Sequence, residues 1–122
     1  MTGKVLARPL PVLFACSCGT SAGRLAPRVA AALDRAGKAE AAAAAEVEAG
    51  MAQALTKARE RFPVIALDGC ERACARRGLE RRGVTPFAHY LLSTFGIASR
   101  EGGNFTPAEE KAALAAIAAG LG

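Results

Sequence analysis

The stretch Val64-Ile65-Ala66-Leu67-Asp68-Gly69-Cys70-Glu71-Arg72-Ala73-Cys74 decides the fold of this chain. Its four apolar residues, 64–67, predict a short buried strand, and Asp68-Gly69 is a turn pair. Residues 71–82 are rich in Ala, Arg, Leu and Glu, which favour a helix. Cys70 therefore lies where a strand gives way to a helix. We expect Cys74 to follow one turn later, on the same helical face.

A second junction of the same kind lies upstream. Residues 12–16 predict another short strand, which runs into the small-residue loop Cys16-Ser17-Cys18-Gly19-Thr20-Ser21-Ala22-Gly23. The chain has four cysteines, and all of them lie at these two junctions. The start of a helix also favours a negative charge such as a thiolate. This concentration of sulfur is the main functional signal of the sequence.

Strands and helices alternate along the rest of the chain. Helices are predicted over residues 24–36 and from Thr106 onward, where Thr106, Pro107 and Glu109 form a capping box. A further strand is predicted within residues 84–92. Residues 38–61 leave two alternatives open, because alanine favours helix throughout while a short strand at residues 41–45 also fits.

This alternation predicts a three-layer α/β fold of the Rossmann-like or flavodoxin-like kind. We expect a mostly parallel sheet of about four strands, with helices on both faces. Residues 1–122 are interpreted as one domain, with residues 1–11 as a lead-in and residues 101–122 as a C-terminal loop and helix. The carboxyl ends of parallel strands meet at one edge of such a sheet, so the two cysteine pairs are expected to form one four-sulfur site.

Composition limits the classes of partner and the cellular location that we expect for this protein. The formal charge is +5, but acidic residues are interleaved and aromatic residues are few, so nucleic-acid binding is not expected.

No stretch approaches the roughly 18 apolar residues of a membrane span. The apolar run that follows Lys4 and Arg8 is too short for a signal peptide, and prolines interrupt it. We therefore expect a cytoplasmic protein, in which clustered cysteines indicate metal binding or catalysis rather than disulfides. The sequence does not identify a protein partner.

A thiolate metal site is the first hypothesis, with zinc as the cofactor and Cys16, Cys18, Cys70 and Cys74 as ligands. The spacings C-x-C and C-x-x-x-C differ from the paired C-x-x-C of zinc ribbons. Ser17 and Asp68 are expected beside the ligands, although Asp68 also fits a helix cap or half of a turn. Excess negative charge would be offset by one of three arginines, Arg24, Arg72 or Arg76. The competing interpretation is that the cysteines are small buried hydrophobic residues.

A thiol enzyme is the alternative. Cys18 and Arg24 have the spacing C-x-x-x-x-x-R after a strand, as in low-molecular-weight tyrosine phosphatases and some arsenate reductases. The sequence has no later Asp-Pro acid and the loop lacks the usual Asn, so we favour metal binding over catalysis. Redox or sulfur transfer, and a soft-metal or metalloid carrier or sensor, stay open as well.

Two other features have plain structural interpretations. His89 is the single histidine of the chain, and we expect it as a partly buried strand residue rather than as a ligand. Five arginines lie around much of the helix predicted after the Cys70 junction, so they are expected to form a solvated surface: Arg72, Arg76, Arg77, Arg81 and Arg82.

Asp68-Gly69-Cys70, with Cys74 and an Ala/Arg-rich helix behind it, resembles the DGC domain family. These are small bacterial and archaeal proteins that are named for this tripeptide and described as zinc-binding through four cysteines. The resemblance covers residues 12–100 and implies that Cys16, Cys70 and Cys74 are three of the ligands.

The family commonly carries a cysteine in a middle strand, where residues 41–45 of this chain are all alanine. Either Cys18 replaces that cysteine, or three thiolates hold the metal, or no metal is held. The resemblance also favours the strand at residues 41–45, and we adopt the strand over the helix.

Overall fold

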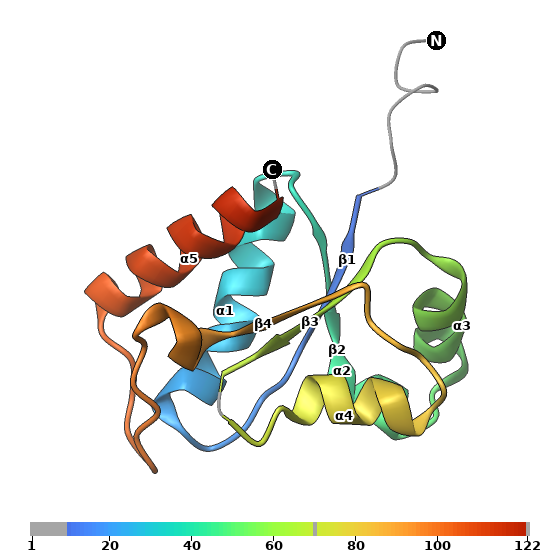
Figure 1. Cartoon of the computed structure of the whole chain (residues 1–122), viewed down its shortest axis with the longest axis horizontal. Helices are drawn as coiled ribbons and strands as arrows, with labels where there is room; N and C mark the ends of the chain where they lie inside the picture. Colours follow the sequence, from blue (N-terminus) through green and yellow to red (C-terminus); the bar gives the residue numbers. More distant parts are fainter. Residues whose placement is uncertain (1–9, 70, 122) are drawn as a thin grey trace, which may run out of the picture.

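Four parallel strands form the centre of the protein (Figure 1). The computed structural model describes residues 10–69 and 71–121. The strands are β1 (Val12–Ala15), β2 (Glu40–Ala43), β3 (Val64–Asp68) and β4 (Ala88–Leu91), and their spatial order is β2-β1-β3-β4. This is the order of the first four strands of a flavodoxin-like sheet. The predicted three-layer α/β fold is confirmed.

Helices cover both faces of this sheet. On one face α1 (Ser21–Arg35) lies against the strands and packs with α5 (Pro107–Leu121), as Figure 1 shows at the left. The other face carries α2 (Ala44–Glu48), α3 (Ala52–Glu60) and α4 (Cys74–Arg81), and a short 3-10 helix, η2 (Leu92–Phe95), follows β4. The two central strands β1 and β3 are buried along their whole length, which explains why their sequences are continuously apolar up to Asp68.

The first helix begins three residues earlier than predicted. The hydroxyl of Thr20 accepts a hydrogen bond from the Gly23 N–H at 2.9 Å, so Thr20 caps a helix that starts at Ser21 rather than at Arg24. Pro27 consequently lies inside α1 rather than in its first turn. The small residues that were assigned to a loop are therefore partly the first turn of this helix.

The helix after β3 begins later than predicted. α4 starts at Cys74, because Ala73 has left-handed backbone angles, with φ 52° and ψ 49°. Residues 71–73 are therefore not helical, and Cys74 is the first residue of the helix instead of a residue one turn into it. The argument that the sulfurs of Cys70 and Cys74 share a helical face loses its basis, and Cys70 itself lies outside the described residues.

The alanine-rich segment contains both a strand and helices. Residues 40–43 form the edge strand β2, paired with β1, so the strand prediction is correct for three of its five residues. Glu40 fixes the start of this strand through ion pairs with Lys57 at 2.6 Å and Arg61 at 2.8 Å. Both cations lower the pKa of Glu40. Sheet pairing and these ion pairs together outweigh the helix propensity of alanine.

The remaining elements agree more closely with the pattern. The predicted strand within residues 84–92 is confirmed in its second half, as β4. At the start of α5, the Thr106 N–H donates to the carboxylate of Glu109 at 2.9 Å and the Glu109 N–H donates to the Thr106 hydroxyl at 3.1 Å, so the capping box is formed. Hydrogen bonding to Arg100 is the largest of the effects that lower the pKa of Glu109 to about 2. Within the part of the chain that the structure describes, no helix combines the length and apolar character needed to cross a bilayer.

Candidate functional site

The candidate site lies where the strand order reverses. The chain moves from β1 out to β2 and then returns to the other side of β1 as β3, so the boundary between β1 and β3 is the switch point of the sheet. Ligands of open α/β sheets bind outside the carboxyl ends of the strands at such a point. Cys16 directly follows β1, and Gly69 directly follows β3.

A hydrogen bond crosses this switch point. The Gly69 N–H donates to the sulfur of Cys16, with an N···S distance of 3.3 Å. The Cys16 N–H in turn donates to the Leu67 carbonyl at 3.0 Å, which continues the pairing of β1 with β3 beyond the strand ends. The Cys16 side chain is therefore held directly beside the Asp68-Gly69 turn.

Glycine at position 69 is required by the approach of α1. A Cβ atom on Gly69 would overlap the backbone of Ala22 and Gly23, in the first turn of that helix. The second residue of the Asp-Gly-Cys tripeptide thus lets the turn after β3 pack directly on the helix that follows β1.

The environment of Cys16 favours a neutral thiol. Burial is the largest of the effects that raise its pKa to about 12; the Gly69 N–H acts in the opposite direction, while the charges of Asp68 and Cys18 raise it further. A thiol in these surroundings is a poor nucleophile without a nearby cation. A bound cation would reverse this balance, because it stabilises the thiolate.

Cys18 lies two residues after Cys16 in the same loop. Its sulfur is 3.3 Å from the Thr20 hydroxyl, and it packs so closely on Gly23 that a Cβ atom there would overlap it. Thr20 therefore contacts Cys18 and caps α1 with the same side chain. Ser17, between the two cysteines, is exposed.

Residues 98–101, here called the clasping segment, are hydrogen-bonded to this loop. The Ser21 hydroxyl donates to the Ala98 carbonyl at 3.1 Å and accepts from the Arg100 N–H at 2.8 Å. The Ser21 N–H donates to the Arg100 carbonyl at 2.9 Å, and Thr20 forms an antiparallel bridge with Glu101. Ser21 is fully buried by these contacts.

A solvent-open cavity of about 560 Å³ lies over this edge of the sheet. It is bordered by the cysteine loop, by the turn after β3 and by the clasping segment. Its lining residues are Thr20, Glu71, Arg72, Ser93, Gly96, Ile97, Ala98, Ser99 and Glu101.

Asp68 is the buried acidic residue of the site. Its side chain is fully buried, and the carboxylate accepts from the Ala75 N–H at 2.6 Å and the Arg76 N–H at 3.1 Å. The third partner is His89, whose Nε2 lies 2.8 Å from Oδ2 of Asp68. Asp68 therefore caps α4 although it is not adjacent to this helix in the sequence, which agrees with the cap interpretation. Through His89 it also connects α4 to β4.

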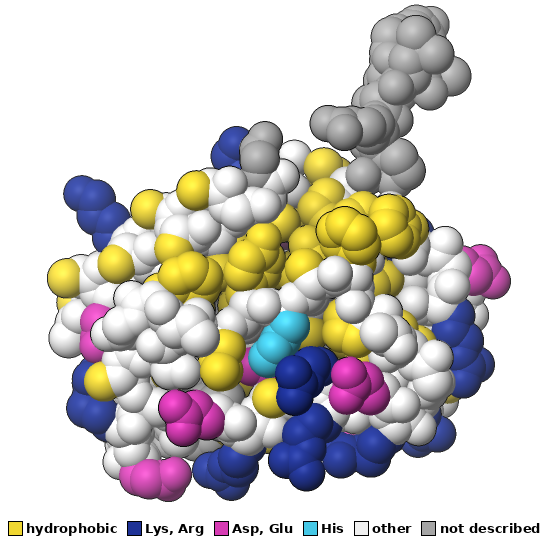
Figure 2. Space-filling view, viewed as in Figure 1, with side chains coloured by type: hydrophobic (Ala, Val, Ile, Leu, Met, Phe, Trp, Pro, Cys, Tyr) yellow, Lys and Arg dark blue, Asp and Glu magenta, His cyan; other side chains and the backbone are white. Residues whose placement is uncertain are grey.

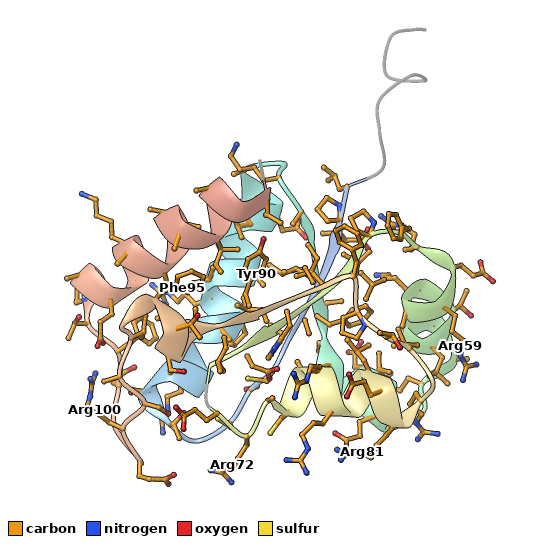
Figure 3. All side chains as sticks on the ribbon, viewed as in Figure 1. Arg59, Arg72, Arg81, Tyr90, Phe95 and Arg100 are labelled. Atoms are coloured by element: carbon orange, nitrogen blue, oxygen red, sulfur yellow. The ribbon has the colours of Figure 1, made fainter. Side chains whose placement is uncertain are left out.

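The three arginines that were expected to offset the charge of the thiolates lie at the surface. Figure 2 shows Lys and Arg side chains gathered along the lower edge of the molecule, over α4, and Figure 3 shows Arg72 and Arg81 pointing outward there. Arg72 pairs with Glu101 at 3.5 Å, and Arg81 pairs with Glu48. Arg24 and Arg76 are exposed as well.

The loop amides bear on the phosphatase-type alternative. An oxyanion cradle would need free backbone N–H groups between Cys18 and Arg24. Three of these donors already have protein acceptors: Ser21 donates to Arg100, Gly23 to Thr20, and Arg24 to the Thr20 carbonyl. The role of Cys18 as a nucleophile with Arg24 stays a prediction, with few donors left in the loop to support it.

The described cysteines do not by themselves form a metal centre. Among residues 10–69 and 71–121, no three His, Cys, Asp or Glu side chains are grouped so that they could hold a metal ion. Cys16, Cys18 and Cys74 are the described members of the predicted ligand set, and a complete set needs Cys70, which directly follows Gly69 in the chain.

Comparison with known proteins places this arrangement in a family. Residues 12–117 match the family described as the DGC domain. The chain belongs to the DGC domain family. It is similar to the anaerobic and virulence modulator AnvM of Pseudomonas aeruginosa, with 38% identity over 94 residues that cover 77% of this chain and 72% of that protein. No solved structure matches the chain. The DGC domain match extends beyond residue 100 and includes most of α5.

Sequence reasoning missed three contributors to this DGC domain site. His89 is a partly buried strand residue, as expected, but its bond to Asp68 was not predicted, because only the register of β3 and β4 reveals it. Thr20 carries a recognisable signal, since a threonine just before a run of small apolar residues is a typical helix cap. Ser21 gave no signal, because its partners Ala98 and Arg100 are distant in the sequence.

Proposed function

We propose that this DGC domain protein binds a metal ion, with zinc as the preferred ion, through the thiolates of Cys16, Cys70, Cys74 and Cys18. The observation that carries the proposal is the hydrogen bond from the Gly69 N–H to the sulfur of Cys16. It brings the cysteine after β1 against the turn after β3, and Cys70 is the residue that follows this turn in the sequence. This supports the proposal that cysteines far apart in the sequence share one site.

The chemistry of the donors supports a soft or borderline cation. Zinc prefers thiolate sulfur and is held in closed structural sites by four protein ligands. Cys16 keeps its proton in the absence of a cation because it is buried beside Asp68, and metal binding would release that proton. When bound, zinc would supply an inert cross-link between protein segments rather than a reactive centre.

Metal analysis of the purified, reduced and untagged protein tests the proposal. We expect about one zinc per chain after incubation with zinc and removal of the excess. Chelation should then increase the number of thiols that react with an aromatic disulfide reagent. Cys70→Ser and Cys16→Ser should lose the metal. Ser17→Ala is the matched control, because it alters an exposed residue between two candidate ligands and should retain the metal.

Two results would overturn the proposal. One is protein that takes up no zinc while its thiols are reduced and its fold is intact by circular dichroism. The other is a Cys70→Ser variant with the metal content of the unmodified protein. In the first case, buried and inert thiols would favour the purely structural interpretation of the cysteines, and reactive thiols would favour thiol chemistry at Cys18.

A metal-dependent regulator is the second candidate. The similar protein AnvM is named a modulator, and a regulatory role fits a protein whose metal occupancy signals the state of the cell. Thiolates also select copper(I) and related soft ions. Competition between zinc and copper(I) for the purified protein separates the two candidates. A closed and rigid structural zinc site should keep its zinc in the presence of equimolar copper(I). A regulatory site should release it. Cytoplasmic location is part of this proposal, because a reducing compartment keeps the thiols free.

A further inference from the structure

His89 reaches Asp68 because of the parallel register of β3 and β4. Ala66 pairs with His89 and Asp68 pairs with Leu91, so Asp68 and His89 are diagonal neighbours. Residues two apart on a strand share a face, and the two side chains therefore lie on the same side of the sheet. The Asp68 side chain is fully buried, whereas 19% of the His89 side chain is exposed.

The carboxylate of Asp68 also anchors the start of α4. Its Oδ1 accepts from the Ala75 N–H and its Oδ2 accepts from the Arg76 N–H, in addition to the contact with His89. The preceding Ala73 is left-handed, a conformation that is unfavourable for a residue with a Cβ atom. This turn has no side-chain cap of its own, since the N-cap residue is an alanine. The hydrogen bonds that Asp68 accepts therefore stabilise the first turn of α4, which begins at Cys74.

We propose that His89 is a positioning residue for the cysteine site, and this inference rests on the proposed function. By donating from Nε2 to Oδ2, His89 fixes the orientation of the Asp68 carboxylate, and Asp68 in turn fixes the first turn of α4 and the sulfur of Cys74. A partner that orients a ligand through a hydrogen bond commonly changes metal affinity by about 10- to 100-fold when it is removed. The proposal gives His89 the role of a hydrogen-bond partner of Asp68, through its Nε2, and not the role of a ligand.

Cobalt(II) provides a direct spectroscopic test, because thiolate-to-cobalt bands report the number and geometry of sulfur ligands. The variants are His89→Phe, which has no donor, and His89→Gln, whose amide can donate from a similar place. Tyr90→Phe is the matched control, since it changes the next residue of the same edge strand by one hydroxyl. We expect His89→Phe to bind cobalt at least about tenfold more weakly, with altered bands. His89→Gln and Tyr90→Phe should resemble the unmodified protein.

A second measurement needs no metal. In the metal-free protein, the amide hydrogens of Ala75 and Arg76 should exchange with solvent faster in His89→Phe than in His89→Gln. This exchange, read by NMR, keeps the inference testable even if His89→Phe folds poorly, because His89→Gln can then be compared with the unmodified protein, which it should match.

The outcomes separate the two proposals. Cobalt bands and affinity that are the same in His89→Phe as in the unmodified protein would overturn the positioning role and leave metal binding intact. Equal impairment in His89→Gln and His89→Phe would also overturn it, because the donor would then be irrelevant. An unmodified protein that binds neither cobalt nor zinc would overturn both.

Discussion

Gly69 and Ala22 are packed backbone against backbone, so closely that any side chain at position 69 would overlap the Ala22 carbonyl. This contact joins the turn after β3 to the first turn of α1, and the hydrogen bond from Gly69 to Cys16 depends on it. The turn and the cysteine loop are consequently one packed unit, and several changes in it should have measurable effects.

Gly69→Ala should destabilise the protein by at least about 2 kcal/mol, because the new methyl group forces two backbone segments apart. Urea denaturation followed by circular dichroism measures this loss. Gly19→Ala is the matched control: it lies in the neighbouring loop, and a Cβ atom there meets no atom within 4 Å. Similar midpoints for the two variants would show that the approach of Gly69 to α1 is not tight in solution.

Asp68→Ala should lower the free energy of unfolding by about 2–5 kcal/mol, because it leaves the N–H groups of Ala75 and Arg76 without their acceptor. Asp68→Asn should lose less, since one amide oxygen remains to accept. Asp34→Ala is the control, because Asp34 also accepts a backbone N–H, that of Ala41, but at an exposed position. We expect less than about 1 kcal/mol there. Equal losses at the two sites would contradict the burial argument.

The stability of the metal-free protein should fall as the pH rises from about 9 toward 12. The folded state keeps the proton of Cys16, whose pKa is about 12, while the unfolded chain releases it near the ordinary value of 9.0. The unfolded state therefore binds fewer protons in this interval, and each pH unit costs up to about 1.4 kcal/mol. Urea midpoints between pH 8 and 11, in the presence of a reductant, measure the slope. Cys16→Ala should show a shallower slope, and identical slopes would refute the assignment.

Thr106→Ala should destabilise the protein by about 1 kcal/mol through loss of the cap on α5. The effect reaches the core because Ile117 of this helix is fully buried. Thermal unfolding measures it, and Thr56→Ala, at an exposed position inside α3, should cause little change or a slight gain. A normal melting temperature for Thr106→Ala would mean that α5 is held by packing alone.

The central strands and the last helix could be predicted because their signals are local. Continuous apolar runs identify β1 and β3, and the reciprocal bonding of Thr106 and Glu109 is written in four consecutive residues. The position of Cys16 beside the Asp68-Gly69 turn could also be anticipated, because a parallel sheet brings strand ends to one edge.

The other features depend on contacts that sequence patterns do not encode. α4 begins at Cys74 because Asp68 bonds to its amides and Ala73 is left-handed, neither of which follows from helix propensity. β2 exists because β1 pairs with it, although its residues are mostly alanine. The bond between His89 and Asp68 requires the register of β3 and β4.

The clasp formed by Ser21 with Ala98 and Arg100 has a consequence for the order of synthesis. All four cysteines precede residue 75 in the chain, whereas the clasping segment comes after them. A ribosome therefore completes every candidate ligand before it makes the residues that close the cysteine loop. The nascent chain therefore passes through a stage in which all four cysteines have been made but Ser21 still lacks its partners Ala98 and Arg100.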